Sequence, residues 1–166
     1  MASILNVDKV RATGSTTDGL IVNSSGQVAQ PALPYAMVNA TGATVTPSAT
    51  VTYNNVISSS GISWNTSNYT FTVPVTGIYC FNGAIRLDAN RGYVWWAVAD
   101  NGGNVLQASK LVLAMGGASS GFTTCSGSCL QSLTAATTYK IIFSDDTASS
   151  VGISGGQTWM DVHLVG

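Results

Sequence analysis

The chain has 166 residues, 45% of them apolar and only 8% charged, with a formal net charge of −1 at pH 7. This length suits one packed domain with a short appendage and excludes two full domains. The low charge excludes a phosphate-binding surface of clustered Lys and Arg, so we expect no nucleic-acid partner. A surface made mainly of Ser, Thr, Asn and Gly repels other molecules weakly, and we expect neighbouring subunits to cover much of it.

Residues 1–33 differ from the rest and predict a short N-terminal arm. Its apolar residues are candidates for anchoring the protein to a shell: Ile4, Leu5, Val7, Val10, Leu20, Ile21 and Val22. Gly26 suits the positive φ of a small β-hairpin turn. So short a segment cannot bury its own apolar face, so we expect it to fold within an oligomer or on a partner; the alternative is a disordered tail. Pro31 and Pro34 mark the boundary with a second domain over residues 34–166.

We expect no export signal at the start of the chain, because no basic flank followed by an apolar run is present there. No stretch is apolar enough over its length to span a bilayer, so we expect no membrane insertion and synthesis in a cytoplasm. Free thiols made in a reducing compartment are expected at Cys80, Cys125 and Cys129. Along a strand, Cys125 and Cys129 would lie too far apart to bridge, although a turn through Gly127 would bring them closer.

From Tyr35 onward the apolar residues alternate as in β-strands, and no window holds a convincing helical repeat. We expect strands over residues 35–38, 49–57, 69–73, 79–87, 92–99, 105–106, 110–115, 122–133, 139–144 and 158–165. Residues 58–61 are expected to form a turn, and Pro74–Gly77 is expected to join its two flanking strands into a hairpin. Short strands separated by Gly, Ser, Asn and Asp predict an antiparallel sandwich.

The segment Tyr93–Ala99 is apolar on both faces, since its odd-numbered and its even-numbered positions are both apolar. A sandwich strand buries only one of its faces in its own core. We therefore expect a neighbouring subunit to cover the second face. Residues 111–115 repeat this pattern more weakly, and a buried interior strand would look the same.

Several segments carry a family resemblance. Phe71–Phe81, which reads Phe-Thr-Val-Pro-Val-Thr-Gly-Ile-Tyr-Cys-Phe, resembles the central signature of the globular head of complement's first component, a relative of the tumour necrosis factor jelly rolls. Tyr93–Gly102 is similar to the strand and Asn-Gly turn that follow it. Trp159–Val165 resembles the closing strand, without the usual Phe-Ser-Gly-Phe. Ser126–Ile141 is similar to two strands and their connector, but Thr134–Thr138 replaces the usual acidic pair.

The resemblance implies an all-β fold, an antiparallel jelly-roll sandwich of ten strands that forms a homotrimer, here with a short N-terminal arm. In such trimers the domains pack around a three-fold axis by their aromatic faces. The candidates for this trimer interface are Tyr79, Phe81, Trp95 and Trp96.

The N-terminal segments Met1–Val10 and Gly19–Val28 look like the start of small capsid-decoration and tail-fibre proteins of bacteriophages. This resemblance implies a structural protein of the virion that binds the major capsid protein or another virion component. A trimeric capsid cement protein, which bridges neighbouring capsomers, is the leading hypothesis. A receptor-binding tip or small tail fibre that touches a host surface is the alternative, and a secreted lectin-like module is disfavoured because we expect no export signal.

We expect no enzyme activity, no cofactor and no metal. Gly117–Gly121 matches the G-x-S-x-G pattern of serine hydrolases, but no helix follows it and His163 is the only candidate base. His163 itself is expected to be an ordinary strand histidine rather than a metal ligand or pH sensor. Asp88 with Asn90, Asp100 with Asn101, and the pair Asp145-Asp146 offer oxygen ligands for calcium. Their spacing is too sparse for a dedicated site, and turn formation explains them.

Overall fold

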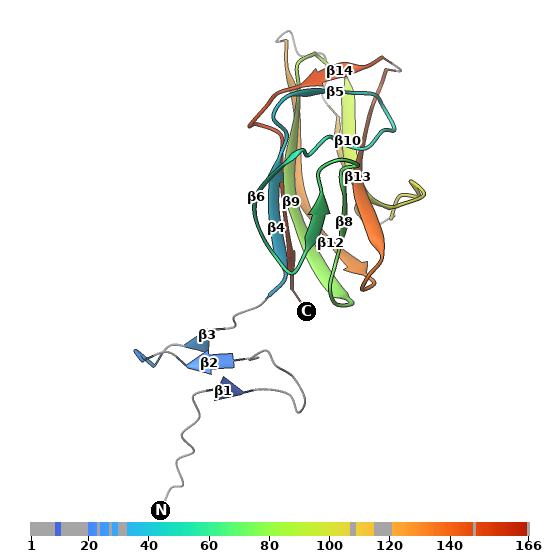
Figure 1. Cartoon of the computed structure of the whole chain (residues 1–166). Helices are drawn as coiled ribbons and strands as arrows, with labels where there is room; N and C mark the ends of the chain where they lie inside the picture. Colours follow the sequence, from blue (N-terminus) through green and yellow to red (C-terminus); the bar gives the residue numbers. More distant parts are fainter. Residues whose placement is uncertain are drawn as a thin grey trace, which may run out of the picture. The chain divides into compact units, whose positions relative to one another are not determined.

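The structure is a computed structural model that describes residues 9–10, 20–22, 24–26, 28–29, 33–106, 109–114, 121–147 and 149–165. The chain divides into two compact units, residues 1–33 and 34–166. Strands build both units (Figure 1). Within the described ranges, no helix is long and apolar enough to cross a membrane.

The N-terminal unit contains a small antiparallel sheet in the order β1-β2-β3. Its strands are β1 (Lys9–Val10), β2 (Leu20–Val22) and β3 (Val28–Ala29). Val22 lies opposite Val28, and Gly26 in the connecting turn has a φ of 74°. Of the predicted anchoring residues, Val10, Leu20, Ile21 and Val22 lie in these strands, and Val22 is exposed. Ile4, Leu5 and Val7 lie outside the described residues.

Residues 34–166 form an antiparallel sandwich of two sheets, which confirms the predicted all-β jelly roll. The five-stranded sheet has the order β11 (Leu111–Ala114), β10 (Tyr93–Asp100), β13 (Thr138–Asp145), β8 (Thr70–Thr72) and β7 (Ser63–Asn65). The seven-stranded sheet has the order β5 (Ala43–Val45), β14 (Val151–Ile153), β9 (Gly77–Leu87), β15 (Trp159–Leu164), β4 (Tyr35–Asn39) and β6 (Asn55–Ser60). Its remaining strand, β12 (Thr123–Leu133), pairs with β9 over the full length of both.

Aromatic and branched side chains fill the space between the two sheets. Phe71 of the five-stranded sheet lies 5.9 Å from Phe81 of the seven-stranded sheet, measured between ring centroids, and it stacks on Trp64 at 5.1 Å. Trp96 on β10 is completely buried in the same core. Each such side chain contributes about 1.5–3 kcal/mol on burial, so this core holds the sheets together and leaves the other face of each sheet outside.

The predicted hairpin around Pro74–Gly77 is wrong, although both of its strands exist. β8 pairs with β7 and β13, whereas β9 pairs with β12, β14 and β15, so the connection crosses from one sheet to the other. Both strands turn their apolar residues toward one core from opposite sides. Alternation shows which residues of a strand point inward. It is the same for two strands paired in a hairpin and for two strands in opposite sheets, so it did not distinguish these connections.

The predicted turn at residues 58–61 is also wrong in its bounds, because Ser58–Ser60 belong to the edge strand β6. β6 pairs with β4, with an irregularity beside Met37 and Val38. Most of the expected strand over 49–57 is extended chain that follows the edge of β13, where Val51 donates to the Ile141 carbonyl at 2.8 Å. A run of serines does not by itself predict a strand. Ser58–Ser60 form one because β4 provides the partners for their backbone hydrogen bonds.

The predicted trimer-interface residues need correction. Tyr79, Phe81 and Trp96 are fully buried inside the domain, so their side chains offer no surface to a second subunit. Trp95 is half-buried on the outer face of the five-stranded sheet, where the Lys110 ammonium lies 4.4 Å from its ring centroid.

The outer face of β10 is also covered differently from the prediction. Ala97, Ala99 and Ile142 are buried there, and Trp95 and Val105 of the same chain pack against them. Trp95 and Val105 cover these side chains, so no second subunit is needed to bury them. The sequence pattern showed that this face was apolar but not that the chain itself covers it.

Candidate functional site

The outward side of β12, β9, β15 and β4 forms a broad surface, which we call the open sheet face. Strand pairing places its side chains in rows across the four strands. One row runs Leu130, Cys80, His163 and Tyr35; the next runs Ser128, Asn82, Asp161 and Met37; a third runs Ser126, Ala84, Trp159 and Asn39. Their neighbours along each strand point into the core, since successive side chains alternate between faces.

Large apolar side chains are concentrated on the open sheet face. Seven of the eleven exposed large apolar residues in the described part of the chain belong to it: Tyr35, Met37, Ile78, Phe122, Leu130, Trp159 and Val165. Leu130 is the most exposed of those within a strand, at 56%. Apolar patches of this kind mark interaction sites on soluble proteins.

Five of these residues gather toward the end of the sheet where β9 begins, and we call them the association patch: Tyr35, Met37, Ile78, Leu130 and Val165. The Val165 amide donates to the Ile78 carbonyl at 2.8 Å, so the chain's last described residue continues this surface. The Tyr35 hydroxyl lies 2.9 Å from the Ser58 hydroxyl on the neighbouring strand. Four of the five residues of the patch therefore lie in paired strands, and Val165 directly follows one.

A small polar group lies in the middle rows of the face, and we call it the polar centre. Asp161 accepts a hydrogen bond from the Asn82 amide at 3.2 Å, and the same oxygen lies 3.2 Å from His163 Nδ1. The Cys80 thiol donates weakly to the Asn82 side-chain oxygen at 3.8 Å. The predicted ordinary strand histidine is thus half-exposed and paired with a carboxylate.

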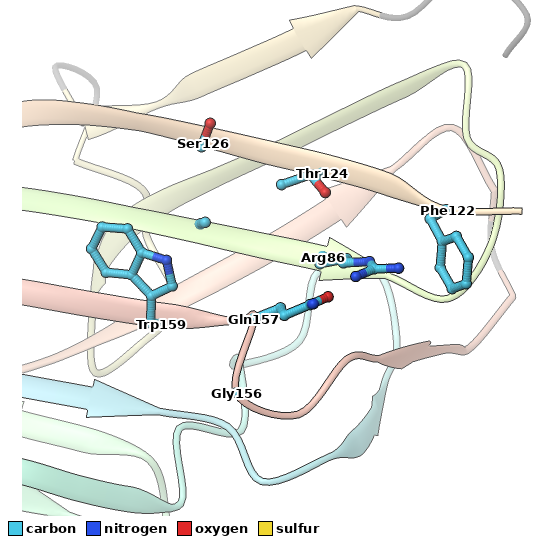
Figure 2. Close-up of a pocket in the computed structure, with 8 residues that line it drawn as sticks. Arg86, Phe122, Thr124, Ser126, Gly156, Gln157 and Trp159 are labelled. Carbon is cyan, nitrogen blue, oxygen red and sulfur yellow. The ribbon is translucent and has the colours of Figure 1, made fainter. Parts of the chain in front are cut away.

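A hollow of about 710 Å³ lies at the other end of the open sheet face, where β9 ends and β12 and β15 begin. Its lining is Ala84, Arg86, Phe122, Thr124, Ser126, Gly156, Gln157 and Trp159. Figure 2 shows Trp159 at one end, the paired Arg86 and Phe122 at the other, and Gln157 between them. The Arg86 guanidinium lies 4.1 Å from the Phe122 ring centroid.

Three of the acidic residues considered as calcium ligands, Asp100, Asp145 and Asp146, have other partners. Asp145 is bound by Arg91 at 2.5 Å and accepts from the Thr147 backbone and hydroxyl, and Asp146 accepts from the Gly92 amide. Hydrogen bonds from Asn104 lower the pKa of Asp100, which closes its own turn. In the part of the chain that the structure describes, no group of three or more His, Cys, Asp and Glu could hold a metal ion.

The cysteines lie on two neighbouring strands. Cys80 and Cys129 are free and half-buried, and Cys125 is buried with its sulfur 3.9 Å from the Leu111 carbonyl oxygen. Burial, with a smaller contribution from nearby Cys80, raises the pKa of the Cys129 thiol to about 11. A thiol with such a pKa is protonated at neutral pH and is a poor nucleophile.

Only Gly121 of the hydrolase-like motif Gly117–Gly121 is among the described residues. His163, its candidate base, points outward from β15 and contacts Asp161. The absence of hydrolase chemistry at Ser119 therefore stays a prediction.

Sequence reasoning missed the outward residues of the seven-stranded sheet. It named Tyr79 and Phe81 as candidates for the trimer interface, whereas Ile78, Cys80 and Asn82 occupy the outward side of β9. The signal was present, because alternation separates these two sets. The sequence did not show which set faces the core, because both contain apolar residues.

Comparison with known proteins gives a fold. No family model matches this sequence, and no curated protein sequence matches it either. Among solved structures, the chain is similar to Eiger TNF from S. frugiperda, with 11% identity and a TM-score of 0.61 over 81% of this chain and 92% of that one. It is similar to the globular domain of zebrafish complement 1qA, with 15% identity and a TM-score of 0.60 over 81% and 98%. Murine APRIL at pH 8.5 matches with 11% identity and a TM-score of 0.55 over 79% and 99%.

Proposed function

We propose that this protein is a structural component of a bacteriophage virion, a homotrimeric capsid decoration protein that stabilises the shell by bridging neighbouring capsomers. The observation that carries the proposal is the combination of a short N-terminal unit with a jelly-roll head whose open sheet face carries seven exposed large apolar residues. The resemblance of residues 1–28 to small phage proteins supports the same assignment.

The head associates through the association patch. Its five apolar side chains are exposed in the single chain, and burying them removes apolar surface from water at about 25 cal/mol per Å². Only 13 of 166 residues carry a charge, so electrostatic repulsion between copies is weak. The TNF-like and C1q-like jelly roll supports a trimer as the closed assembly, with identical contacts between successive copies.

The arm attaches the trimer to the shell. A ligand that binds only the assembled state stabilises that state by mass action. Three arms on one trimer raise the effective concentration of each arm once the first has bound. No catalytic step is needed for this role, and the protein acts as a non-enzymatic binding component of the particle.

A second candidate, a receptor-binding tip or small fibre of the tail, is favoured by the hollow beside Arg86 and Trp159, since a tip protein needs a site for a surface ligand. The two roles differ in location and in copy number, because the capsid has icosahedral symmetry and the tail has a lower symmetry.

The copy number of the chain in purified virions tests the proposal. Quantitative mass spectrometry against the major capsid protein should give hundreds of copies for a decoration protein, on the order of the number of shell subunits. A count of a few to about a dozen would assign the chain to the tail instead. A chain absent from the particles would contradict both structural roles.

A further inference from the structure

The cation in the hollow has no acidic partner in the part of the chain that the structure describes. Arg86 stacks on Phe122, and its guanidinium makes no hydrogen bond or ion pair within the described residues. By contrast, Arg91 in the same domain binds Asp145 at 2.5 Å. A guanidinium whose face lies on a ring still presents its N–H donors along its edge, in the geometry that suits a carboxylate.

A second donor faces the same space. The Ser154 hydroxyl donates to Gln157 Oε1 at 3.3 Å, which leaves the amide nitrogen of Gln157 to donate. Gln157 lies between Arg86 and Trp159 in the hollow (Figure 2). Among the described residues no Asp or Glu lines the hollow, so within this part of the chain no anionic group matches the donors at the site.

The walls of the hollow suit a ring with both polar and apolar faces. Trp159 is 39% exposed and Phe122 is 48% exposed, so each offers part of an aromatic face. Thr124 and Ser126 add hydroxyl groups from β12. The volume of about 710 Å³ lies in the range of small-molecule sites. Aromatic surface with a few convergent polar groups binds such ligands by contact and orients them by hydrogen bonds.

We propose that this hollow is a binding site for a carboxylate-bearing sugar unit, such as a uronic acid residue of a surface polysaccharide. Arg86 binds the carboxylate, Gln157 donates to the carboxylate or to a ring oxygen, and Trp159 packs against the sugar ring. An entirely apolar ligand would leave the guanidinium desolvated without a partner, which is unfavourable.

The cation of the site lies away from the far end of the association patch. Arg86 lies eight positions along β9 from Ile78, which corresponds to about 26 Å along the strand. The two surfaces adjoin at Trp159, which lies one row of outward side chains from Met37. Association through the patch therefore leaves Arg86 accessible to a ligand. The inference goes beyond the proposed virion role and depends neither on the shell partner nor on the arm.

The test titrates the full chain with trigalacturonate, and with its methyl ester as the uncharged control, by isothermal titration calorimetry. We expect binding of the acid at millimolar concentration and no binding of the ester. Arg86→Gln should weaken binding of the acid at least about tenfold, since a charged hydrogen bond is lost. Lys110→Gln is the matched control, because it removes a cation that also lies over a ring, on the other sheet, and should leave binding unchanged.

A second variant guards against misfolding of the first. Gln157→Glu changes an exposed loop residue and places a like charge beside the ligand, so binding should fall with the fold intact. Equal binding of acid and ester, unaltered binding by both variants, or no binding by the wild type would overturn the proposal. The mass of each variant in solution is measured in parallel. If a second copy of the chain occupies the hollow instead, Arg86→Gln should change the mass and the acid should not bind. That result would also overturn the proposal.

Discussion

Cys129 shows how one residue's surroundings set its chemistry. Its thiol is half-buried between β12 and β9, and burial raises its pKa from about 9 to about 11. The raised pKa means that the folded state favours the protonated form more than the unfolded state does. Stability from this residue is therefore complete below the unfolded-state pKa and is lost as the pH rises through about 11.

Replacing Cys129 by Ser tests this linkage. The wild-type chain should lose more free energy of unfolding between pH 9 and pH 11 than Cys129→Ser does, as measured by urea unfolding at each pH. Cys80→Ser is the control: it leaves the Cys129 thiol in place and removes only the smaller cause of its raised pKa, so it should keep most of the wild-type slope. Identical slopes in all three proteins would contradict the raised pKa.

At the scale of elements, β10 shows why an aromatic strand was misassigned. Trp96 and Trp95 are neighbours, yet the first is fully buried in the core and the second is half-buried on the outer surface. Tryptophan at both positions predicted two buried faces, and only the structure shows that Val105 and the Trp95 ring cover the outer one.

The two tryptophans should therefore respond differently to truncation. Trp96→Ala should cost about 3–5 kcal/mol of unfolding free energy, because it opens a cavity between the sheets. Trp95→Ala should cost less, since its ring is partly solvated. Chemical denaturation of both variants measures the difference. A Trp96→Ala protein with wild-type stability and a smaller assembly would return Trp96 to a subunit contact.

The strands of the jelly roll were largely predictable from alternation, and their partners were not. The expected segments at 92–99, 122–133 and 139–144 fall on β10, β12 and β13. The short strands β5 and β14 were missed, because three residues carry too little periodicity. Pairing depends on contacts that are distant in sequence, such as Ala84 with Trp159, which no local pattern encodes.

At the scale of the whole molecule, the candidate site was the least predictable part. Its residues come from four strands spread between Tyr35 and Val165, and each looks ordinary in its own segment. Arg86 became a candidate binding residue only because the fold places Phe122, the residue before β12, against its guanidinium. The expectation that neighbouring subunits cover much of the surface rested on composition, and the open sheet face, with its exposed large apolar residues, is the place that we propose for that contact.

The central claim is that the association patch joins copies of the chain, and the mass of the full chain in solution tests it most directly. Sedimentation equilibrium should give three times 17.0 kDa for the wild type. Leu130→Asp, a change at a side chain that is 56% exposed in the single chain, should give one chain, because assembly would bury the new charge. Val75→Asp, also exposed but in the connection between the sheets, should stay a trimer. A wild-type mass of 17.0 kDa, or a trimer that survives Leu130→Asp, would contradict the account.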